Sequence, residues 1–472
     1  FGASDAEIFE SHKQILQDES LLKEVAEELE KELVNAEQAV RNVLRKWTKK
    51  LDQVENEKVR SSSEDVEDLN KRLLRVLLGY EKNILEDIPP SSIVVAKRLL
   101  PSDTVHLQRR NLKGIIVDVG SFNSHSAILA RTLGIPSLSK PEADIYSIQG
   151  DRTMIIDAVE GLAVVDPEES ALRSYEKKIR EYQKEEERKI RASEKKAVTQ
   201  KGTEIRVMAN ASTPEDFRIA LSHGCEGIGL FRIEHIYLSS RILPDKEFLV
   251  KHFQETLSQA PDKATTLRLL DVGGDKNLPY MDFADEYSPF LGTRGVRLLL
   301  RYPDLLNEQL EAVVALMDRY NIRILLPMVT LADEIAQIRD HLKQVSAAAA
   351  ERIALGSMIE TPAAVFNIES IVRECDFVSI GTNDLIQYTM VAGRENPNVS
   401  SYYNRGIDTL LPEIKNMVDV CQENKKPCCL CGEIAGDVEW TSSLLETGLR
   451  EISVSPHMIP SIKEAIRKVS TV

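Results

Sequence analysis

Hydrophobic and polar positions follow three different patterns along the chain, and the first covers residues 1–82. Leu21 to about Leu44 carries Leu, Val and Ala on one helical face, and Val66–Gly79 repeats this spacing and ends on glycine. Ser61–Ser63 is expected to connect two of the helices. The pattern predicts a small antiparallel helical bundle. Bundles of this kind often dock partner proteins, but an amphipathic face is more often simply core, so the pattern alone leaves docking open.

A second pattern, typical of an α/β domain, begins near residue 88. Short runs rich in Ile and Val predict strands, and the second of them leads directly into a loop that contains His125. We assign residues 83–167 to this compact domain. The predicted strands are Ile93–Ala96, Gly114–Val119, Ile145–Ile148, Thr153–Ile156 and Leu162–Val165.

Residues 168–199 form a linker of different composition. Within residues 170–197 charges of both signs recur at i, i+4 spacing, and there is no glycine or proline. This favours a long solvated helix over disorder, and we predict a stiff arm between two domains.

After residue 200 the chain repeats a unit of strand, polar segment and amphipathic helix. Eight such units in residues 200–472 predict a (β/α)₈ barrel. The fold class is therefore multidomain α/β with a helical domain ahead of it. The eight predicted strands are Ile205–Ala209, Gly227–Phe231, Thr266–Leu270, Arg323–Leu326, Ile353–Met358, Phe377–Ile380, Cys428–Leu430 and Ile452–Val454.

The stretch from Gly120 to Pro136 carries the first candidate chemistry. Asn123, Ser124 and Ser126 are all able to cap a helix, which places His125 in or near its first turn. The free N–H groups and dipole of a helix start stabilise negative charge. His125 is therefore a candidate to carry a phosphoryl group, although taken alone an ordinary surface histidine is the more frequent outcome.

Polar residues gather just after the predicted barrel strands, where they would face one common mouth. Arginines bind phosphate or carboxylate through two parallel hydrogen bonds, and two carboxylates leave Mg²⁺ room for substrate and water. This set predicts a small, highly anionic, phosphorylated substrate. Its members are Arg232, Glu234, Arg268, Asp271, Glu360, Asn383, Asp384, Cys431 and Glu433, with Arg294 and Arg394 in loops that can reach the same mouth.

Composition excludes several other classes of protein. A formal charge of −15 over 472 residues argues against nucleic acid as the main partner. No apolar run approaches the roughly 18 residues of a membrane span. The six cysteines lack the density of a disulfide framework, which favours a reducing, cytoplasmic location. The spacing of Cys428, Cys429 and Cys431 does not match paired zinc ligands.

Five motifs together resemble enzyme I, the phosphoenolpyruvate–protein phosphotransferase family of the bacterial sugar phosphotransferase system. They are Gly-Ser-Phe-Asn-Ser-His-Ser-Ala-Ile-Leu-Ala-Arg, Leu-Leu-Asp-Val-Gly-Gly-Asp-Lys, Ser-Met-Ile-Glu-Thr-Pro-Ala-Ala, Ser-Ile-Gly-Thr-Asn-Asp-Leu-Ile-Gln-Tyr-Thr and Leu-Cys-Gly-Glu-Ile-Ala-Gly-Asp. The similarity extends from Gly2 to about residue 468. The family has more sequence at both ends, so we expect the natural protein to be longer.

The resemblance implies a role for each candidate residue. His125 would be the phosphorylated histidine, and Cys431 the general acid that protonates the enolate to pyruvate. Residues 1–82 would dock the carrier protein HPr, and residues 83–167 would swivel between HPr and the barrel. A homodimer through the barrel is also implied. Phosphoenolpyruvate would be bound by Arg232, Arg268, Arg294, Asn383 and Arg394, and Mg²⁺ by Glu360 and Asp384.

The sequence departs from the family before the histidine. Ser121, Phe122 and Asn123 stand where the family has Gly, Arg and Thr, so one positive charge beside the phosphohistidine is missing. This keeps a second hypothesis open, a regulatory protein that senses phosphoenolpyruvate without turnover. A third is a fragment of a dikinase-type enzyme, which would require ATP or AMP for labelling. The retained arginines, carboxylates, Cys431 and His125 favour the full enzyme.

Overall fold

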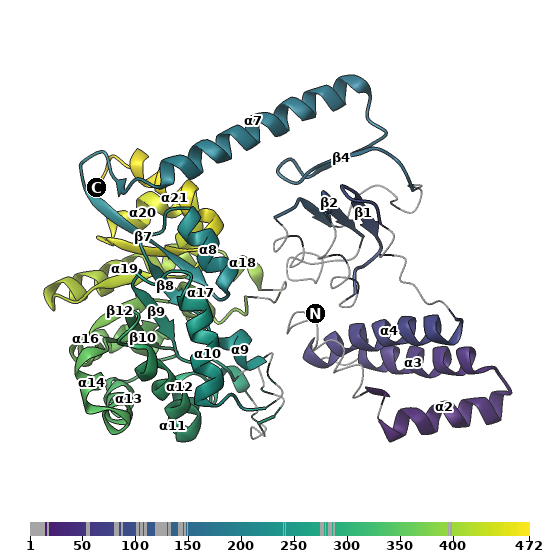
Figure 1. The fold of residues 1–472 in the computed structure, drawn as a ribbon, viewed down its shortest axis with the longest axis horizontal. Helices are drawn as coiled ribbons and strands as arrows, with labels where there is room; N and C mark the ends of the chain where they lie inside the picture. The colour runs from purple at the N-terminus through teal and green to yellow at the C-terminus, as the bar shows by residue number, and fades with distance from the viewer. Residues whose placement is uncertain are drawn as a thin grey trace. The chain divides into compact units, whose positions relative to one another are not determined.

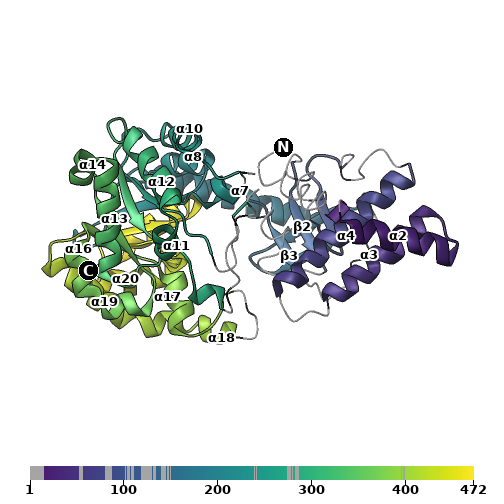
Figure 2. The same ribbon diagram turned by 90° about the horizontal axis from the view of Figure 1, so that it is seen from below.

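The computed structural model divides the chain into two units, Phe1–Glu181 and Tyr182–Val472 (Figures 1 and 2). It describes residues 15–472 except 17, 53–56, 80–84, 86–87, 101–102, 104–106, 108–110, 119–129, 131–133, 140–144, 146–147, 149, 239, 241, 274–277, 279, 282–285, 287, 395 and 397–398, and it does not describe the side chains of 19, 52 and 57–65. His125 lies outside the described residues.

Three helices form the described part of the N-terminal region: α2 (Glu19–Glu32), α3 (Ala36–Asp52) and α4 (Glu57–Leu77). Leu21, Val43, Leu44 and Val66 form their shared apolar core, which confirms the predicted helical bundle. Two details of the prediction are wrong. The segment after Leu21 is broken at Leu33, which takes a left-handed conformation (φ 50°), and Ser61–Ser63 lies inside α4 rather than in a connection.

The next region contains a three-stranded parallel sheet in the order β1 (Ile93–Ala96), β2 (Gly114–Val117), β3 (Ser137–Ser139). An antiparallel hairpin of β4 (Met154–Asp157) and β5 (Leu162–Val165) follows. The predicted strands at residues 93, 114, 153 and 162 are confirmed. The one at Ile145–Ile148 is wrong, because neither of its end residues lies in a strand, and β3 was not predicted.

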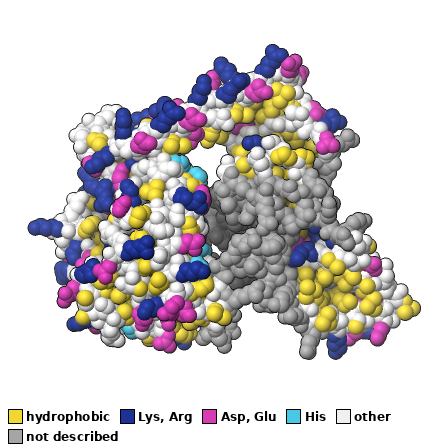
Figure 3. All heavy atoms as spheres, in the orientation of Figure 1, with side chains coloured by type: hydrophobic (Ala, Val, Ile, Leu, Met, Phe, Trp, Pro, Cys, Tyr) yellow, Lys and Arg dark blue, Asp and Glu magenta, His cyan; other side chains and the backbone are white. Residues whose placement is uncertain are grey.

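Helix α7 (Glu169–Ser193) confirms the predicted long charged helix, and the boundary between the two units lies inside it. Lys178 pairs with Asp157 of the hairpin at 2.5 Å. Side chains of both charges alternate along its surface (Figure 3), and i, i+4 pairs such as Arg173–Glu169 support the helix.

The second unit contains a closed barrel of eight parallel strands, in which β14 pairs with β7 to complete the circle. All eight predicted strand positions are confirmed. Five of the strands, β8, β9, β11, β12 and β14, are buried at every residue, as is typical of parallel sheets covered by helices. The strands are β7 (Glu204–Ala211), β8 (Ile228–Phe231), β9 (Thr265–Arg268), β10 (Ile322–Leu326), β11 (Leu355–Ile359), β12 (Phe377–Ile380), β13 (Cys428–Leu430) and β14 (Glu451–Val454), with β6 (Ala197–Val198) paired outside the circle.

Helices surround these strands (Figures 1 and 2) and bury one large apolar core between themselves and the barrel. None of the helices in the described part of the chain is long and apolar enough to cross a membrane. The helices are α8 (Pro214–Ser222), α9 (Glu234–Leu238), α10 (Lys246–Leu257), α11 (Val296–Arg301), α12 (Pro303–Leu316), α13 (Ala332–Val345), α14 (Ala347–Arg352), α15 (Pro362–Phe366), α16 (Ile368–Glu374), α17 (Thr382–Thr389), α18 (Ser400–Tyr403), α19 (Gly406–Glu423), α20 (Thr441–Glu446) and α21 (Ile459–Lys468), with short 3₁₀ turns η3 (Pro289–Leu291), η4 (Glu433–Gly436), η5 (Val438–Trp440) and η6 (Pro456–Met458).

Candidate active site at the barrel mouth

Polar side chains converge on the end of the barrel where the strands finish. Arg268 is the last residue of β9, Glu360 follows β11, and Cys431 follows β13. Asp384 lies in the first turn of α17, after β12, and Arg294 lies just before α11. Because the carboxyl ends of parallel strands in a closed barrel share one mouth, these residues are brought together from distant parts of the sequence.

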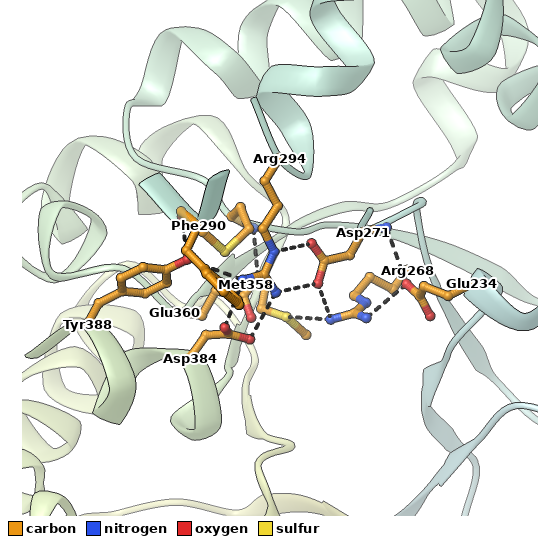
Figure 4. Close-up of polar contacts among 10 residues, drawn as sticks. Glu234, Arg268, Asp271, Phe290, Arg294, Met358, Glu360, Asp384 and Tyr388 are labelled. Atoms are coloured by element: carbon orange, nitrogen blue, oxygen red, sulfur yellow. Dashed lines mark hydrogen bonds and ion pairs between the residues drawn. The ribbon is translucent and has the colours of Figure 1, made fainter. Parts of the chain in front are cut away.

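Five of the side chains form a chain of alternating charge (Figure 4), which runs from Asp384 through Arg294, Asp271 and Arg268 to Glu234. Arg294 contacts Asp271 with Nε and Nη2 at 3.0 and 3.1 Å, and Asp384 with Nη1 and Nη2 at 3.0 and 3.3 Å. Arg268 contacts Asp271 at 3.3 Å and Glu234 at 2.8 Å. Each arginine is therefore held in place by carboxylates on two sides.

The two central arginines stay charged although they are deeply buried. Arg268 and Arg294 are each 7% exposed. Burial opposes their charge, but the carboxylates around them outweigh it and raise the pKa of both guanidinium groups. The mouth therefore holds two permanently charged guanidinium groups that are themselves shielded from water.

Glu360 is the most perturbed carboxylate of the site. Burial, together with the negative charges of Asp384 and Asp271, raises the pKa of Glu360 to about 8. One of its oxygens accepts a hydrogen bond from the backbone N–H of Met328 at 2.7 Å. Met328 has a positive φ of 58°, which is uncommon for residues other than glycine, and this conformation accompanies an N–H group directed at the carboxylate.

The thiol of Cys431 is 2% exposed and interacts electrostatically with Glu360, Arg232 and Arg268 of the mouth. The hydroxyl of Ser379 donates to its Sγ at 3.2 Å, and Sγ lies 3.6 Å from the carbonyl oxygen of Ile380. Burial raises the pKa of Cys431, an effect that the hydrogen bond from Ser379 partly offsets. The side chain is therefore a neutral thiol, suited to donate a proton.

Asn383, Glu433 and Arg394 form a second, more exposed cluster. The amide of Asn383 donates to Glu433 Oε1 at 3.0 Å, and the backbone N–H of Glu433 donates back to Asn383 Oδ1 at 2.9 Å. Arg394 reaches the same carboxylate at 3.6 Å. This cluster connects α17 with the segment after Cys431.

Arg232, which follows β8, differs from the other arginines. Its side chain forms no hydrogen bond or ion pair with another residue of the described chain. Burial and the positive charge of Arg268 lower the pKa of its guanidinium group. An anion bound at the mouth would relieve both effects.

Comparison with known proteins identifies the family. Residues 184–471 match the PEP-binding domain of PEP-utilising enzymes, residues 88–161 their mobile domain and residues 1–61 their N-terminal domain. The phosphoenolpyruvate-protein phosphotransferases of Priestia megaterium and Bacillus subtilis are 34% and 33% identical to this chain over 99% of its length, and it covers 83% and 84% of theirs. The chain belongs to the phosphoenolpyruvate–protein phosphotransferase family.

Membership of this phosphotransferase family confirms the resemblance read from the motifs. It makes the chain a transferase that uses phosphoenolpyruvate as phosphoryl donor. The order of N-terminal, mobile and PEP-binding domains agrees with the predicted helical bundle, α/β domain and barrel. The roles of the individual residues stay predictions.

Glu360 and Asp384 are the carboxylates of the mouth that concern a divalent cation. Among the described residues no three His, Cys, Asp or Glu side chains are grouped closely enough to hold a metal by themselves. Glu360 and Asp384 nevertheless fit one, because they are hard oxygen ligands whose mutual repulsion contributes to the raised pKa of Glu360. Substrate and water would complete the coordination.

Three residues that shape the site were not predicted. Tyr388 contacts Arg294, Ser379 contacts Cys431, and Met328 contacts Glu360 through its backbone. Tyr388 stands four residues after Asp384, so helical spacing could have indicated it. Ser379 stands inside a buried strand, where a polar residue indicates that its side chain has a hydrogen-bond partner. Nothing in the sequence indicates the positive φ of Met328.

Proposed function

We propose that the chain transfers the phosphoryl group of phosphoenolpyruvate to its own His125 and then to a histidine of HPr, releasing pyruvate, as the first step of the sugar phosphotransferase system. The observation that carries this proposal is the alternating chain of charge at the barrel mouth, next to a neutral thiol. It joins fixed positive charge for an anionic substrate to a proton donor.

Phosphoenolpyruvate would be bound by the arginines of the mouth. Arg268 and Arg294 are held rigidly by carboxylates, so they would meet the substrate with little loss of side-chain entropy. Arg232 lacks a partner among the described residues, and an incoming phosphate or carboxylate would supply one. Asn383 and Arg394 would close the site from the more exposed side.

Mg²⁺ would be held by Glu360 and Asp384. When bound, it would neutralise charge that develops on the substrate oxygens. Asp384 is also bonded to Arg294, so Arg294 would keep its contacts with Asp271 if Asp384 turned to the metal.

The phosphoryl step requires a neutral imidazole. A ring nitrogen of His125 would attack phosphorus while the bond from phosphorus to the enolate oxygen breaks, and the arginines would stabilise the equatorial oxygens. The enolate carbon would then take the proton of the Cys431 thiol to give pyruvate. The burial of this thiol supports the assignment, because it keeps the proton in place.

HPr would dock on residues 1–82. Figure 3 shows hydrophobic side chains gathered over the helices of this region. The exposed apolar residues here include Leu22, Leu33, Val76 and Leu78, at 59%, 88%, 75% and 51% exposure. Apolar surface of this kind favours a protein partner. Residues 83–167 would carry the phosphohistidine, residues 168–199 would link the domains, and residues 200–472 would bind phosphoenolpyruvate.

A homodimer would form through the barrel. Four exposed apolar residues lie in the segments that connect β9 to β13 in the barrel unit. They are Phe290, Leu331, Phe366 and Val391, at 43%, 53%, 87% and 88% exposure. The location would be the cytoplasm, which agrees with six unpaired cysteines.

The test combines the protein with labelled phosphoenolpyruvate, Mg²⁺ and an HPr protein, and follows pyruvate and protein-bound phosphate. We expect pyruvate release that depends on HPr, and no labelling of His125→Ala. Binding measured by calorimetry without pyruvate release would instead indicate a phosphoenolpyruvate sensor. Labelling that requires ATP or AMP would indicate a dikinase-type fragment.

A further inference from the structure

Tyr388 lies in the last turn of α17, four residues after Asp384, so both side chains project from the same face of the helix. Its hydroxyl accepts a hydrogen bond from Arg294 Nη1 at 3.2 Å and donates one to the backbone carbonyl of Phe290 at 2.7 Å (Figure 4). The single hydroxyl hydrogen goes to Phe290, so the phenol connects three separate segments of the mouth.

The Tyr388 hydroxyl contacts the one nitrogen of the Arg294 guanidinium group that Asp271 does not hold. Asp271 holds Nε and Nη2 of Arg294, whereas among the described residues Nη1 is held only by Asp384 and Tyr388. Binding of Mg²⁺ by Asp384 would weaken its hold on Nη1. Tyr388 would then be the remaining described contact of that nitrogen.

The contact with Phe290 acts on the segment that carries Arg294. In the single subunit Phe290 is 43% exposed and Leu291 is 68% exposed, so burial within the subunit does not fix this segment. It is fixed by polar contacts, in which Glu286 accepts from the backbone and hydroxyl of Thr293, and Phe290 accepts from Tyr388. The Tyr388 hydroxyl therefore restrains Arg294 directly and also through its backbone.

We propose that Tyr388 is a positioning residue for phosphoenolpyruvate binding, which holds Arg294 over the mouth when Asp384 turns to the metal. This inference rests on the proposed function. It assigns to the hydroxyl a role in substrate affinity that neither the arginine nor the carboxylates provide by themselves.

The test compares Tyr388→Phe with wild-type protein and with Tyr320→Phe. The Tyr320 side chain is buried, whereas that of Tyr388 is half-buried, but the Tyr320 hydroxyl forms no hydrogen bond with a described residue, and Tyr320 precedes β10 at the end of the barrel away from the mouth. Pyruvate release gives KM and kcat, calorimetry with Mg²⁺ gives phosphoenolpyruvate affinity, and thermal unfolding monitors the fold. The same substitution is also made in Arg294→Lys.

We expect Tyr388→Phe to raise KM and the dissociation constant for phosphoenolpyruvate about three- to tenfold, as loss of one hydrogen bond predicts, with kcat nearly unchanged. Tyr320→Phe should match wild type. In Arg294→Lys the loss of the hydroxyl should add less than it does in wild type, because both changes act on one contact.

Wild-type KM in Tyr388→Phe, or an effect that is fully additive with Arg294→Lys, would overturn the inference. Reduced thermal stability with unchanged KM would also overturn it, since that is the signature of a purely structural role. KM does not depend on the active enzyme concentration, so partial misfolding leaves the test valid. If wild type itself neither binds phosphoenolpyruvate nor releases pyruvate, the proposed function fails instead.

Discussion

At the scale of single residues, the buried thiol of Cys431 leads to a prediction about pH. Burial raises its pKa above the ordinary thiol value of about 8.5, so the protonated, acid-competent form persists as the pH rises past that value. We expect pyruvate release by wild type to continue above pH 8.5 without a loss due to this group. We also expect Cys431→Ala to slow pyruvate release about 100-fold at neutral pH. Steady-state rates between pH 6 and 10 measure both effects.

Cys225→Ala is the matched control, because Cys225 is another buried thiol whose pKa burial raises, and it lies outside the mouth. Its pH profile should coincide with that of wild type. A decline in wild-type activity centred at or below about pH 8.5 that disappears in Cys431→Ala would show that the pKa of the thiol is not raised, contrary to this prediction.

The members of the candidate site could be predicted from the sequence, but their pairing could not. Arg268, Glu360 and Asp384 stand out because each follows a buried strand, and parallel strands deliver such residues to one mouth. That Asp271 lies between two arginines depends on side-chain geometry formed by distant strands. The bridge from Tyr388 to Phe290 likewise depends on the course of a long loop, which local propensity does not determine.

At the scale of elements, α21 fixes the end of α7 to the barrel through Lys463. This side chain is 1% exposed, and its Nζ donates to the carbonyls of Ser193 and Gly224 and to the carboxylate of Glu226. Lys463→Met would leave all three acceptors without this donor. We expect a loss of about 2–4 kcal/mol in the free energy of unfolding of the barrel unit, measured by thermal and urea unfolding.

Lys468→Met on the same helix provides the control. Lys468 is largely exposed and pairs with Glu464 at 3.0 Å, so its replacement should cost at most about 0.5 kcal/mol. Equal losses in the two variants would mean that the buried contacts of Lys463 contribute no more than a surface ion pair.

Gly432, in the segment after β13, packs closely against Thr382 at the start of α17. A Cβ atom at this position would lie 2.8 Å from Thr382 Cβ and 2.9 Å from Thr382 N, closer than packed atoms allow. Gly432→Ala should therefore displace the neighbouring Cys431 and Glu433, at a cost of about 1–3 kcal/mol in stability. We expect KM for phosphoenolpyruvate to rise and kcat to fall together, as steady-state assays of pyruvate release would show.

Gly436→Ala tests whether any added methyl group in this segment has the same effect. Its Cβ would meet only Met458, at 3.6 Å or more, which is ordinary van der Waals contact. We expect near-normal kinetics. If both variants are equally impaired, close packing against Thr382 is not the cause.

The elements themselves were predictable to different degrees. The barrel strands were found because they are continuous apolar runs between polar segments. The bundle was found from its 3.6-residue spacing, but Leu33 ends a helix within an apparently continuous pattern, and α4 continues through three serines that resemble a connection. Where a helix begins and ends is determined by capping and packing, which the residue composition of a segment does not reveal.

At the scale of the whole molecule, the unit boundary inside α7 was not predictable. The sequence shows one uninterrupted charged helix, and the prediction was an arm between two domains. In the structure its first part belongs to unit 1, where Lys178 pairs with Asp157, and its last part to unit 2, where Arg188 pairs with Glu464. One helix therefore belongs to both units, which only tertiary contacts reveal.

Association through exposed apolar residues of the barrel unit, among them Phe366, is the last expectation at this scale. In a two-fold symmetric interface each residue occurs once on each subunit. Replacing Phe366 by Glu would therefore remove two aromatic side chains from the interface and bury two carboxylates in their place. We expect Phe366→Glu to weaken dimerisation at least about 100-fold. Sedimentation over a range of protein concentrations measures this. Val159→Glu is the control, because Val159 is similarly exposed at 85% on the turn between β4 and β5. If Phe366→Glu sediments as wild type does, Phe366 does not lie in the dimer interface.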